Sequence, residues 1–519
     1  MQDHKNSLVK SSYIVGGMTF ISRISGFIRD IIFANIFGAS NNTDAFFIAF
    51  KIPNFFRRLF AEGAFIQSFV PVLNEYKVKN PIELKKFISF VQGNLAVILF
   101  IIVLLGITFS ETIISIFAPG FTESDSRYML ASTMLEITFP YLLFISLTAM
   151  SAGIFNTFDK FFLPAITPVV LNICLITAAL FFTQIFSDPI ISLAYGVLIA
   201  GVIQYLIQLP LLYKLDLLVM PRIGFAFQGV NKVIKLMLPV MLGTAVIQIN
   251  LIVDSIVASM LSTGSISWLY YSDRLVEFPL GVFGIAIATV ILPALSKKYT
   301  SENINEYKNT LNKSINLSIA FGIPAMMGLI ILSDIIIVTL FQYGSFTTID
   351  TLMSTWSLMA YAVGLPAFIL MKVLLTGFFS RQDTKTPVKY GIIAVIFNIS
   401  MNLSVLAYYS TYEFEGAHAF LALATSLSAW IQVLLLHNKL KKDGLILDAT
   451  IFSIQTLQVF VCSLVMLLVL IYILSFVSNW TQLEYYIRGI LLIFYISIGG
   501  ITYLISMYFF GFRFKEFYI

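Results

Sequence analysis

The sequence predicts an all-α polytopic membrane protein with about fourteen transmembrane helices. Three observations lead to this prediction: the composition, a succession of long apolar stretches, and the uneven distribution of lysine and arginine between them. Hydrophobic residues make up 58% of the 519 residues, charged residues only 11%, and the mean hydropathy is +0.90. Soluble domains carry about 25% charged residues. The composition therefore excludes a soluble protein.

The transmembrane spans are expected where apolar stretches of about 18 or more residues lie between polar loops. The expected ranges are 12–37, 43–76, 87–109, 127–155, 161–185, 190–213, 231–262, 265–296, 310–333, 350–380, 388–409, 416–438, 452–477 and 485–511. Several exceed the roughly 20 residues that a bilayer requires, so they are expected to tilt, bend or protrude. The first range contains Arg23, Arg29 and Asp30 and therefore does not resemble a cleavable signal peptide.

Lysine and arginine fall in alternate loops. With the N-terminus inside, the inner segments hold 23 of the 32 lysines and arginines, whereas the outer loops hold only Arg127 and Arg488. The other seven lie within the spans. Cytoplasmic loops of membrane proteins carry this excess of positive charge. The sequence therefore predicts that both termini are cytoplasmic.

An internal repeat is visible at an offset of about 222–226 residues. The paired segments are 71–76 with 293–299, 110–120 with 333–344, Pro140 with Pro366, and 153–159 with 377–383. Each half contains six spans, so the repeats are parallel, and parallel repeats predict two lobes with a site between them. The expected domains are a six-helix lobe at 1–220, a second six-helix lobe at 221–440, and a linker with two additional helices at 441–519.

Charged residues inside the second span indicate a site. Lys51, Arg57, Arg58 and Glu62 lie in an otherwise apolar stretch. One charge at a bilayer centre costs roughly 2.5–3.5 kcal/mol even on the lenient insertion scale. These side chains must therefore face protein or a water-filled cavity. Lys51, Arg58 and Glu62 follow the i, i+7, i+11 spacing of one helical face.

Spans one and eight add further charges, and two interpretations remain open. Span one contributes Arg23, Arg29 and Asp30, and span eight contributes Asp273, Arg274 and Glu277. One interpretation is structural ion pairing, for example between Arg274 and Glu277. The other is a cavity that binds a phosphate-bearing headgroup, because the arginine fork suits phosphate. The arginines of the first two spans outnumber the nearby acids, which favours the cavity.

Two single residues have alternative roles. Asp44 follows Asn41, Asn42 and Thr43 at a helix start, so a capping role is more typical than a ligand role. Lys372 lies within a span and either lines the cavity or extends to the membrane interface.

A second candidate site combines Asp254 with Asn398, Asn402 and Thr425. Asp254 lies in an apolar run without a basic residue within one turn, and Asn398 and Asn402 are four residues apart on one helical face. A carboxylate in this position is protonated, paired or bound to a cation. Oxygen ligands suit a hard cation such as Na⁺. The alternative is a protonated Asp254 with asparagines that join helices by hydrogen bonds.

Several function classes find no support in the sequence. Cys174 and Cys462 both lie in apolar runs, and His4, His418 and His437 are isolated, so neither a disulfide nor a zinc site is expected. No phosphate-binding loop, Gly-rich nucleotide loop or Ser/His/Asp arrangement occurs, which argues against an ATP-driven pump. The net charge of +5 is spread over loops, so nucleic acid is not an expected partner. No cofactor is expected other than Na⁺ as a coupling ion.

Five segments carry a resemblance to a known family. They are SRISGFIRD (22–30), NNTDAFFIAFKIPNFFRRLFAEGAFIQSFVPVL (41–73), WLYYSDRLVEFPLGVFGIAIATVILPALS (268–296), LFQYGSFT (340–347) and GFFSRQDTKTPVK (377–389). Together they closely resemble the MurJ/MviN family, the lipid II flippases of bacterial peptidoglycan synthesis. This family belongs to the multidrug/oligosaccharidyl-lipid/polysaccharide exporter superfamily. The likeness covers essentially the whole chain.

The resemblance implies a fold and a set of site residues. The fold is two six-helix lobes with two extra helices, which form with the second lobe a groove for the lipid tail. Arg23, Arg29, Arg57 and Arg274 match the cavity arginines that hold the diphosphate. The charged positions that match around them are Asp30, Asp44, Lys51, Arg58, Glu62, Asp273, Glu277 and Lys372.

The resemblance also implies a function. The protein would flip lipid II, an undecaprenyl-diphosphate-linked disaccharide-peptide, across the bacterial cytoplasmic membrane by alternating access, driven by membrane potential or a cation gradient. Such a protein is a transporter and not an enzyme, and its candidate protein partners are cell-wall synthesis proteins. The alternatives are a flippase for another polyprenyl-linked glycan, a multidrug/cation antiporter of the same superfamily, and a non-transporting scaffold.

Overall fold

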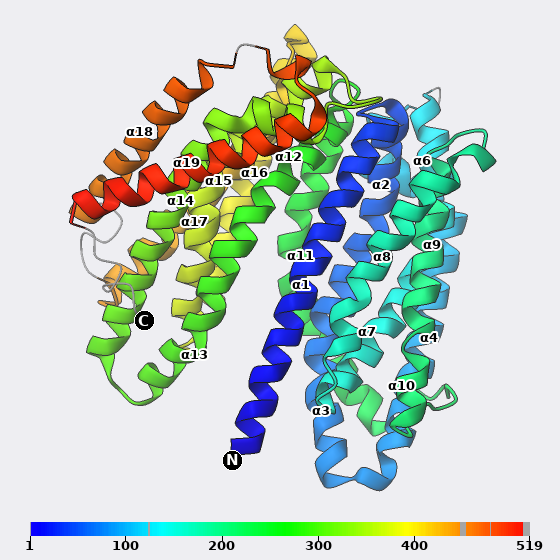
Figure 1. Cartoon of the computed structure of the whole chain (residues 1–519). Helices are drawn as coiled ribbons and strands as arrows, with labels where there is room; N and C mark the ends of the chain where they lie inside the picture. Colours follow the sequence, from blue (N-terminus) through cyan, green and yellow to red (C-terminus); the bar gives the residue numbers. More distant parts are fainter. Residues whose placement is uncertain (1, 123–124, 447–452, 478, 512–519) are drawn as a thin grey trace. The chain divides into compact units, whose positions relative to one another are not determined.

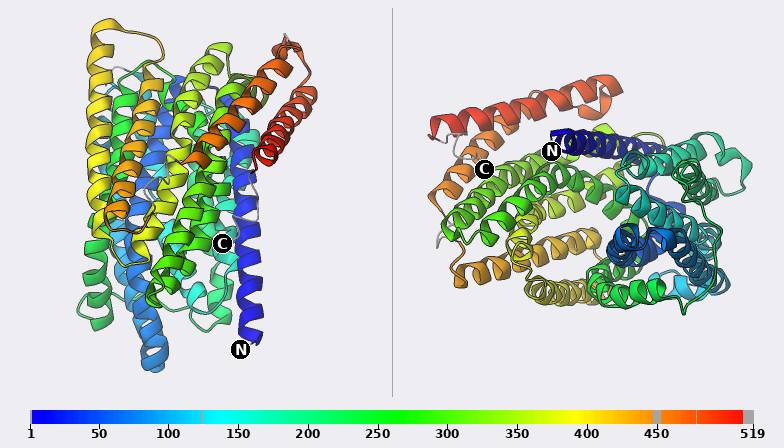
Figure 2. Two further views of the ribbon diagram at one scale, coloured as in Figure 1. Left: turned by 90° about the vertical axis from the view of Figure 1, so that its left-hand side faces the viewer. Right: turned by 90° about the horizontal axis from the view of Figure 1, so that it is seen from below.

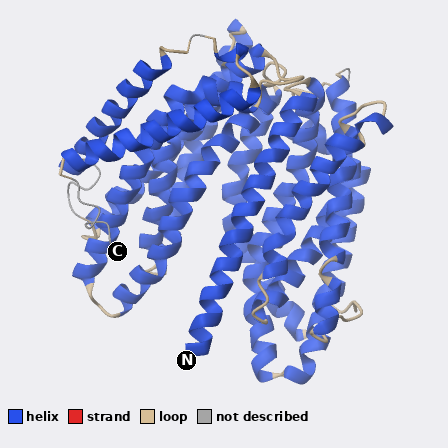
Figure 3. Ribbon diagram, in the orientation of Figure 1, coloured by secondary structure: helices blue, strands red, loops and turns tan. Residues whose placement is uncertain are grey.

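The computed structural model describes residues 2–122, 125–446, 453–477 and 479–511, without the side chains of residues 2–14, 60–62 and 242–247. Within these residues the secondary structure is helical and no strand occurs (Figure 3). The chain divides into two compact units, Met1–Gly264 and Ser265–Ile519.

The first unit contains eleven α-helices among its described residues, together with three shorter helical segments (Figure 1). They are α1 (Gln2–Phe37), α2 (Asn41–Phe56), η1 (Arg57–Phe65), α3 (Ile66–Lys79), η2 (Pro81–Glu83), α4 (Leu84–Thr108), α5 (Ser110–Phe117), α6 (Ser126–Thr138), α7 (Tyr141–Thr157), α8 (Phe162–Phe181), η3 (Thr183–Ile185), α9 (Ile191–Leu206), α10 (Leu209–Lys214) and α11 (Gln228–Ser259).

The second unit contains eight α-helices and two shorter helical segments among its described residues. Its elements are α12 (Ser265–Pro279), η4 (Leu280–Ile285), α13 (Ala286–Thr300), α14 (Ile304–Leu340), α15 (Thr348–Phe379), α16 (Lys385–Tyr412), α17 (Ala417–Lys442), α18 (Ile454–Leu474), η5 (Trp480–Gln482) and α19 (Tyr485–Phe509).

The all-helical membrane class predicted from the sequence is confirmed. Every expected span overlaps a helix, and eleven helices of the described residues are long and apolar enough to cross a membrane. The expected spans 12–37, 43–76 and 231–262 are not among these eleven. The first two contain the charged residues that indicated a site. The total of fourteen crossings and the position of the termini stay predictions.

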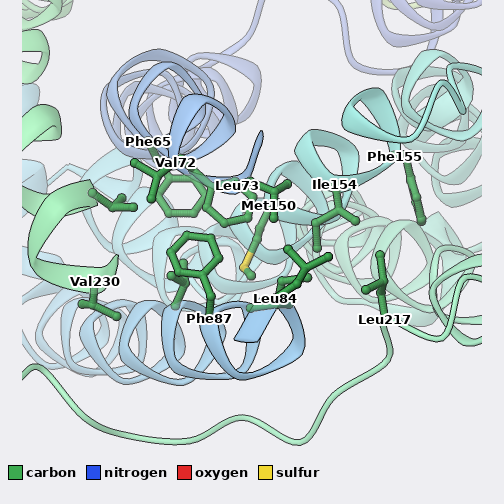
Figure 4. Packing of buried hydrophobic residues seen from close by; sticks show 14 of the residues in the cluster. Phe65, Val72, Leu73, Leu84, Phe87, Met150, Ile154, Phe155, Leu217 and Val230 are labelled. Carbon is green, nitrogen blue, oxygen red and sulfur yellow. The ribbon is translucent and has the colours of Figure 1, made fainter. Parts of the chain in front are cut away.

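The core of the first unit includes a cluster of aromatic and aliphatic side chains (Figure 4). Phe69 of α3 stacks on Phe87 of α4 with ring centroids 5.8 Å apart, and Tyr76 of α3 stacks on the same Phe87 ring at 4.4 Å. Helices α7, α10 and α11 complete the cluster with Met150, Leu212 and Val230. This packing holds α3, α4 and α11 together.

In the second unit α15 is the central helix. Helices α12, α14 and α17 all pack against it. Glycines permit these close approaches: a Cβ at Gly322 of α14 would lie 2.9 Å from the Cα of Pro366, and one at Gly364 would lie 2.5 Å from Ser426 Oγ. Small residues at helix interfaces let backbones approach closely in membrane proteins. Helices α18 and α19 form an antiparallel pair beside α14 (Figure 2).

Local structures recur between the units at the spacing of the sequence repeat. The first unit has a π-helix at η1, between α2 and α3, and the second has one at η4, between α12 and α13. The hydrogen bond from Lys160 N to Phe155 O has its counterpart 223 residues later, from Asp383 N to Phe378 O. Such recurrence is what a parallel repeat predicts.

Candidate functional site

The charged residues of α1 are held in a buried network. The Arg29 guanidinium donates to Asp30 Oδ1 from Nε at 2.9 Å and from Nη2 at 2.6 Å. Its Nη1 donates to Asn172 Oδ1 of α8 at 3.0 Å. Arg29 is 6% exposed and Asp30 is 1% exposed. Arg29 is therefore neutralised within the helix bundle, as the ion-pair interpretation of these residues expects.

Asn172 also fixes the path of α1. Its Nδ2 donates to the carbonyl of Ser22 at 3.1 Å and to Ser25 Oγ at 2.9 Å. A Cβ at Gly26 would already touch Nδ2 at 3.4 Å. Asn172 is not among the site residues predicted from the sequence, although an amide in an otherwise apolar stretch is a signal that marks it.

Arg57 lies at the junction between α2 and the π-helix η1. Its Nε donates to Asn54 Oδ1 at 3.0 Å, and Asn54 Nδ2 donates to the carbonyl of Phe50 at 2.9 Å. Lys51 and Arg58, on the same stretch, are exposed. Asn54 is a second residue that the sequence analysis missed, and its spacing of three from Arg57 is the signal.

The π-helix corrects one prediction about the second span. Lys51, Arg58 and Glu62 were expected on a single α-helical face, but residues 57–65 form i→i+5 hydrogen bonds. The α-helical spacing of 3.6 residues per turn therefore does not extend past Arg57. The side chain of Glu62 lies outside the described residues.

Asp44 has a different role from the capping that was predicted. The N-cap of α2 is Ser40, whose side chain accepts the Thr43 N–H at 3.4 Å. Asp44 lies in the first turn and is 1% exposed. Its Oδ2 accepts the N–H of Gly264 at 2.7 Å. The carboxylate therefore connects the start of α2 with the turn that follows α11.

In the second unit the predicted charges of α12 lie on the side opposite its packed face. Trp268, Tyr271 and Leu275 are buried, whereas Asp273 and Glu277 are exposed. Arg274 Nη1 donates to Glu277 Oε2 at 2.7 Å, and its guanidinium lies 5.0 Å from the centroid of the Tyr270 ring. Lys372 on α15 is exposed.

Three of the four predicted cation ligands come together in the second unit. Asn402 Nδ2 donates to Asn398 Oδ1 at 2.9 Å, and Asn398 Nδ2 donates to Thr425 Oγ1 of α17 at 3.2 Å. Both asparagines are fully buried. Asp254 belongs to α11 of the first unit and is half-buried. No group of three or more His, Cys, Asp or Glu side chains that could hold a metal occurs among the described residues.

Comparison with known proteins identifies the family. The model of the family "Lipid II flippase MurJ" matches residues 33–491. A probable lipid II flippase MurJ of Vibrio cholerae is 43% identical, and the alignment covers 98% of this chain and 97% of that protein. A probable lipid II flippase MurJ of Buchnera aphidicola (Schizaphis graminum) is 42% identical, and the alignment covers 98% of each chain. A lipid II flippase MurJ of Burkholderia cenocepacia is 37% identical over 85% of both chains.

Solved structures agree with this result. A structure of lipid II flippase MurJ in an inward closed conformation superposes with a TM-score of 0.81 and is 33% identical, covering 96% of this chain and 98% of its own. An inward-facing multidrug transporter of the MATE family, from the MOP superfamily, reaches a TM-score of 0.65 at 12% identity, covering 83% of this chain, which shows a shared fold.

The apolar helices and the bacterial relatives also give the location of the protein, a multi-pass protein of the bacterial inner membrane. Because the family model covers most of the sequence and the relatives align over nearly all of it, this chain belongs to the MurJ family of lipid II flippases.

Proposed function

We propose that this protein flips lipid II from the cytoplasmic to the outer leaflet of the bacterial inner membrane by alternating access. Membership of the MurJ family supports this function directly. The observation that carries the mechanism is the excess of positive charge on the helices of the first unit. No covalent bond of the lipid changes, so the protein acts as a transporter.

The charge excess does not depend on how the side chains pair. Residues 22–65 contain five cationic side chains and three acidic ones, so this stretch keeps a net positive charge. Arg29 is matched by Asp30. The excess therefore belongs to Arg23, Lys51, Arg57 and Arg58 taken together. A diphosphate is the part of lipid II that such a group attracts, because guanidinium groups bind phosphate oxygens in pairs.

The roles of the individual residues follow from the family resemblance. Arg23, Arg29, Arg57 and Arg274 are proposed to hold the diphosphate, with Asp30, Lys51, Arg58, Glu62, Asp273, Glu277 and Lys372 around them and Asp44 at a gate. The two lobes of six helices, a groove for the lipid tail at α18 and α19, and cytoplasmic termini complete the proposal. The recurrence of η1 as η4 supports the two-lobe arrangement.

Na⁺ is proposed as the coupling ion, with Asp254, Asn398, Asn402 and Thr425 as its oxygen ligands. The repeat supports this assignment. Asp254 follows Asp30 by 224 residues, and Asn398 follows Asn172 by 226. In the first unit the Arg29 guanidinium lies against both Asp30 and Asn172. The residue 224 positions after Arg29 is Val253, so the second copy has no arginine at the equivalent position of the chain.

The alternative for this group is structural. The hydrogen bonds from Asn402 to Asn398 and from Asn398 to Thr425 also serve to hold α16 against α17, without any bound ion. Thermal unfolding of the purified protein with and without Na⁺ separates the two. Na⁺ is expected to stabilise the native protein and not the Asp254→Ala variant; an identical response of both proteins to Na⁺ excludes the site.

The function is tested by depletion of the protein in its host, followed by labelling of the lipid-linked precursor on each face of the membrane. Lipid II is expected to accumulate on the cytoplasmic face. Normal arrival on the outer face would refute the proposal. In proteoliposomes, a polyprenyl diphosphate with another glycan serves as the competing substrate and distinguishes a lipid II flippase from one with a different headgroup.

A further inference from the structure

The connection between α10 and α11 is fastened along α4. Residues 216–227, here termed the strap, have no regular secondary structure and link the last helix before the predicted lobe boundary to α11. In a transporter with two moving lobes, such a connection is where a flexible joint is expected. The hydrogen bonds of the strap show instead that it is held against α4.

Two buried polar residues of α4 hold the strap backbone. Asn94 is 2% exposed and uses both ends of its amide: Oδ1 accepts the Gly224 N–H at 3.0 Å, and Nδ2 donates to the Gly224 carbonyl at 3.1 Å. One turn earlier, the Arg222 N–H donates to the carbonyl of Ser89 at 3.0 Å, and Ser89 Oγ donates to the carbonyl of Met220. Backbone N–H and C=O groups of the strap are therefore hydrogen-bonded to groups of α4, although the strap belongs to no regular secondary structure.

The fit between strap and helix is close. A Cβ at Gly93 would lie 2.2 Å from the Arg222 carbonyl oxygen, so only glycine allows the backbone this near. Phe90 stacks on Phe227 with ring centroids 4.9 Å apart. At the start of the strap, Lys85 pairs with Asp216 at 2.5 Å. The contacts thus continue over the whole strap.

The far end of α11 is fastened to the same unit. The Gly120 N–H donates to Ser259 Oγ at 3.2 Å, and a Cβ at Gly120 would lie 2.0 Å from the Ser259 carbonyl oxygen. Asp44 accepts the Gly264 N–H just beyond. Between these ends α11 packs against η1, α3 and α4, and Val230 and Val233 belong to the cluster around Phe87.

We propose that the strap is a permanent clasp, so that α11 moves as part of the first unit throughout the transport cycle. The joint of alternating access then lies at Gly264–Ser265, after α11, and not at the boundary near residue 220 that the repeat suggests. This inference rests on the proposed flipping function. It implies that the sequence repeat and the moving bodies have different boundaries.

The direct test is to make the clasp covalent. In a background in which Cys174 and Cys462 are replaced by alanine, cysteines are introduced at Lys85 and Asp216, the exposed pair at the start of the strap, and joined by a short, reducible bifunctional thiol reagent. The cross-linked protein is expected to flip lipid II in proteoliposomes at the rate of the same protein after reduction. Loss of flipping on cross-linking, restored by reduction, would show that the strap opens during the cycle and would overturn the proposal.

A second test releases the clasp without a cross-link. Asn94→Leu removes both hydrogen bonds to Gly224, so trypsin cleavage after the exposed Arg222 is expected to accelerate at least about tenfold, because the strap opens more often. Gln92→Leu is the matched control: it removes one side-chain hydrogen bond of the same helix, to Tyr205, without touching the strap. Equal cleavage of the two variants would mean that Asn94 does not hold the strap.

The two proposals fail in different ways. If the reduced double-cysteine protein and the unmodified protein both fail to flip lipid II, the proposed function is wrong, whereas the protease result still tests the clasp. If both flip lipid II and only the cross-linked form does not, the function stands and the clasp is refuted.

Discussion

The guanidinium of Arg29 donates two hydrogen bonds to the carboxylate of the adjacent Asp30, with Nη2 2.6 Å and Nε 2.9 Å from Oδ1. Neighbouring residues of a helix do not usually face each other. Asn172 Oδ1 of α8 accepts a third hydrogen bond from Arg29, from Nη1 at 3.0 Å, so the guanidinium is held between the two side chains. A charged group that sequence analysis assigns to the substrate is thus stabilised by the fold itself.

Asp30→Asn is expected to destabilise the protein more than removal of both charges. Loss of one partner leaves a buried arginine uncompensated, at a cost of about 3–5 kcal/mol, whereas replacing a whole buried pair is often nearly neutral. Thermal unfolding of the purified single variant Asp30→Asn and of the double variant Arg29→Gln/Asp30→Asn measures this. A double variant as unstable as the single one would contradict it.

Arg57→Lys is expected to impair flipping while it keeps the charge. Lysine cannot reproduce the Nε hydrogen bond to Asn54 or a forked contact with phosphate. Loss of one hydrogen bond to a charged group corresponds to about 10- to 100-fold in transport efficiency. Lipid II flipping in proteoliposomes provides the measurement. Arg127→Lys is the matched control, since Arg127 pairs locally with Asp125; equal losses in both variants would point to a general effect on folding.

Asp44→Ala is expected to lower stability by about 1–3 kcal/mol, because it leaves the buried Gly264 N–H without its acceptor. Asp44→Asn keeps an acceptor oxygen and is expected to lose less. Urea or thermal unfolding of the two variants, side by side, makes the comparison. If alanine and asparagine behaved alike, the hydrogen bond to Gly264 would not be the source of the effect.

Stability is expected to fall at acidic pH through Asp443, which lies at the end of α17. Partial burial raises the pKa of its carboxyl, but hydrogen bonds from Lys439 and Arg381 lower the pKa by more than burial raises it. The net pKa therefore lies below the ordinary value of 3.8. A lowered pKa in the folded state stabilises the fold above the unfolded pKa, and this contribution disappears as the pH falls through the folded value.

The midpoint of thermal unfolding should therefore drop as the pH falls below about 5, in part through this group. The contribution is about 1 kcal/mol or less, because the two ion pairs of Asp443 are partly exposed. Asp443→Asn should flatten the pH dependence in this range. A variant with the slope of the unmodified protein would exclude Asp443 as its cause.

Helix positions could be predicted from the sequence because the bilayer imposes long apolar stretches that end at polar loops. The ion pair of Arg274 and Glu277 could also be predicted, since residues three apart meet on a helix. These are local properties. The interactions that determine them act between residues a few positions apart, so the sequence alone is enough to predict them.

The rest of the site depends on contacts between distant residues. Asn172 meets Arg29 across 143 positions and Asp44 meets Gly264 across 220, and neither pairing has a local signal. The π-helix η1 was missed for another reason. Hydrophobic spacing was interpreted with the α-helical period, and a single i→i+5 segment changes the spacing only where it occurs.

The π-helix η4 should tolerate a deletion that an α-helix does not. Removal of Val282 lets the backbone of η4 adopt i→i+4 bonds, so the residues after it keep their direction. Helix α13 already has i→i+4 bonds, so it cannot absorb the removal of Thr289 in this way. The deletion therefore turns the buried residues Ile291 and Leu295 by about 100° about the helix axis. Val282 and Thr289 are both exposed, which makes the deletions comparable.

The Val282 deletion is expected to yield folded, monodisperse protein with reduced flipping, because π segments are frequent at functional parts of helices. The Thr289 deletion is expected to yield little folded protein. Size-exclusion chromatography and the flipping assay measure both outcomes. Equal yields would show that η4 does not absorb the change, and normal flipping after removal of Val282 would show that transport does not need the π-helix.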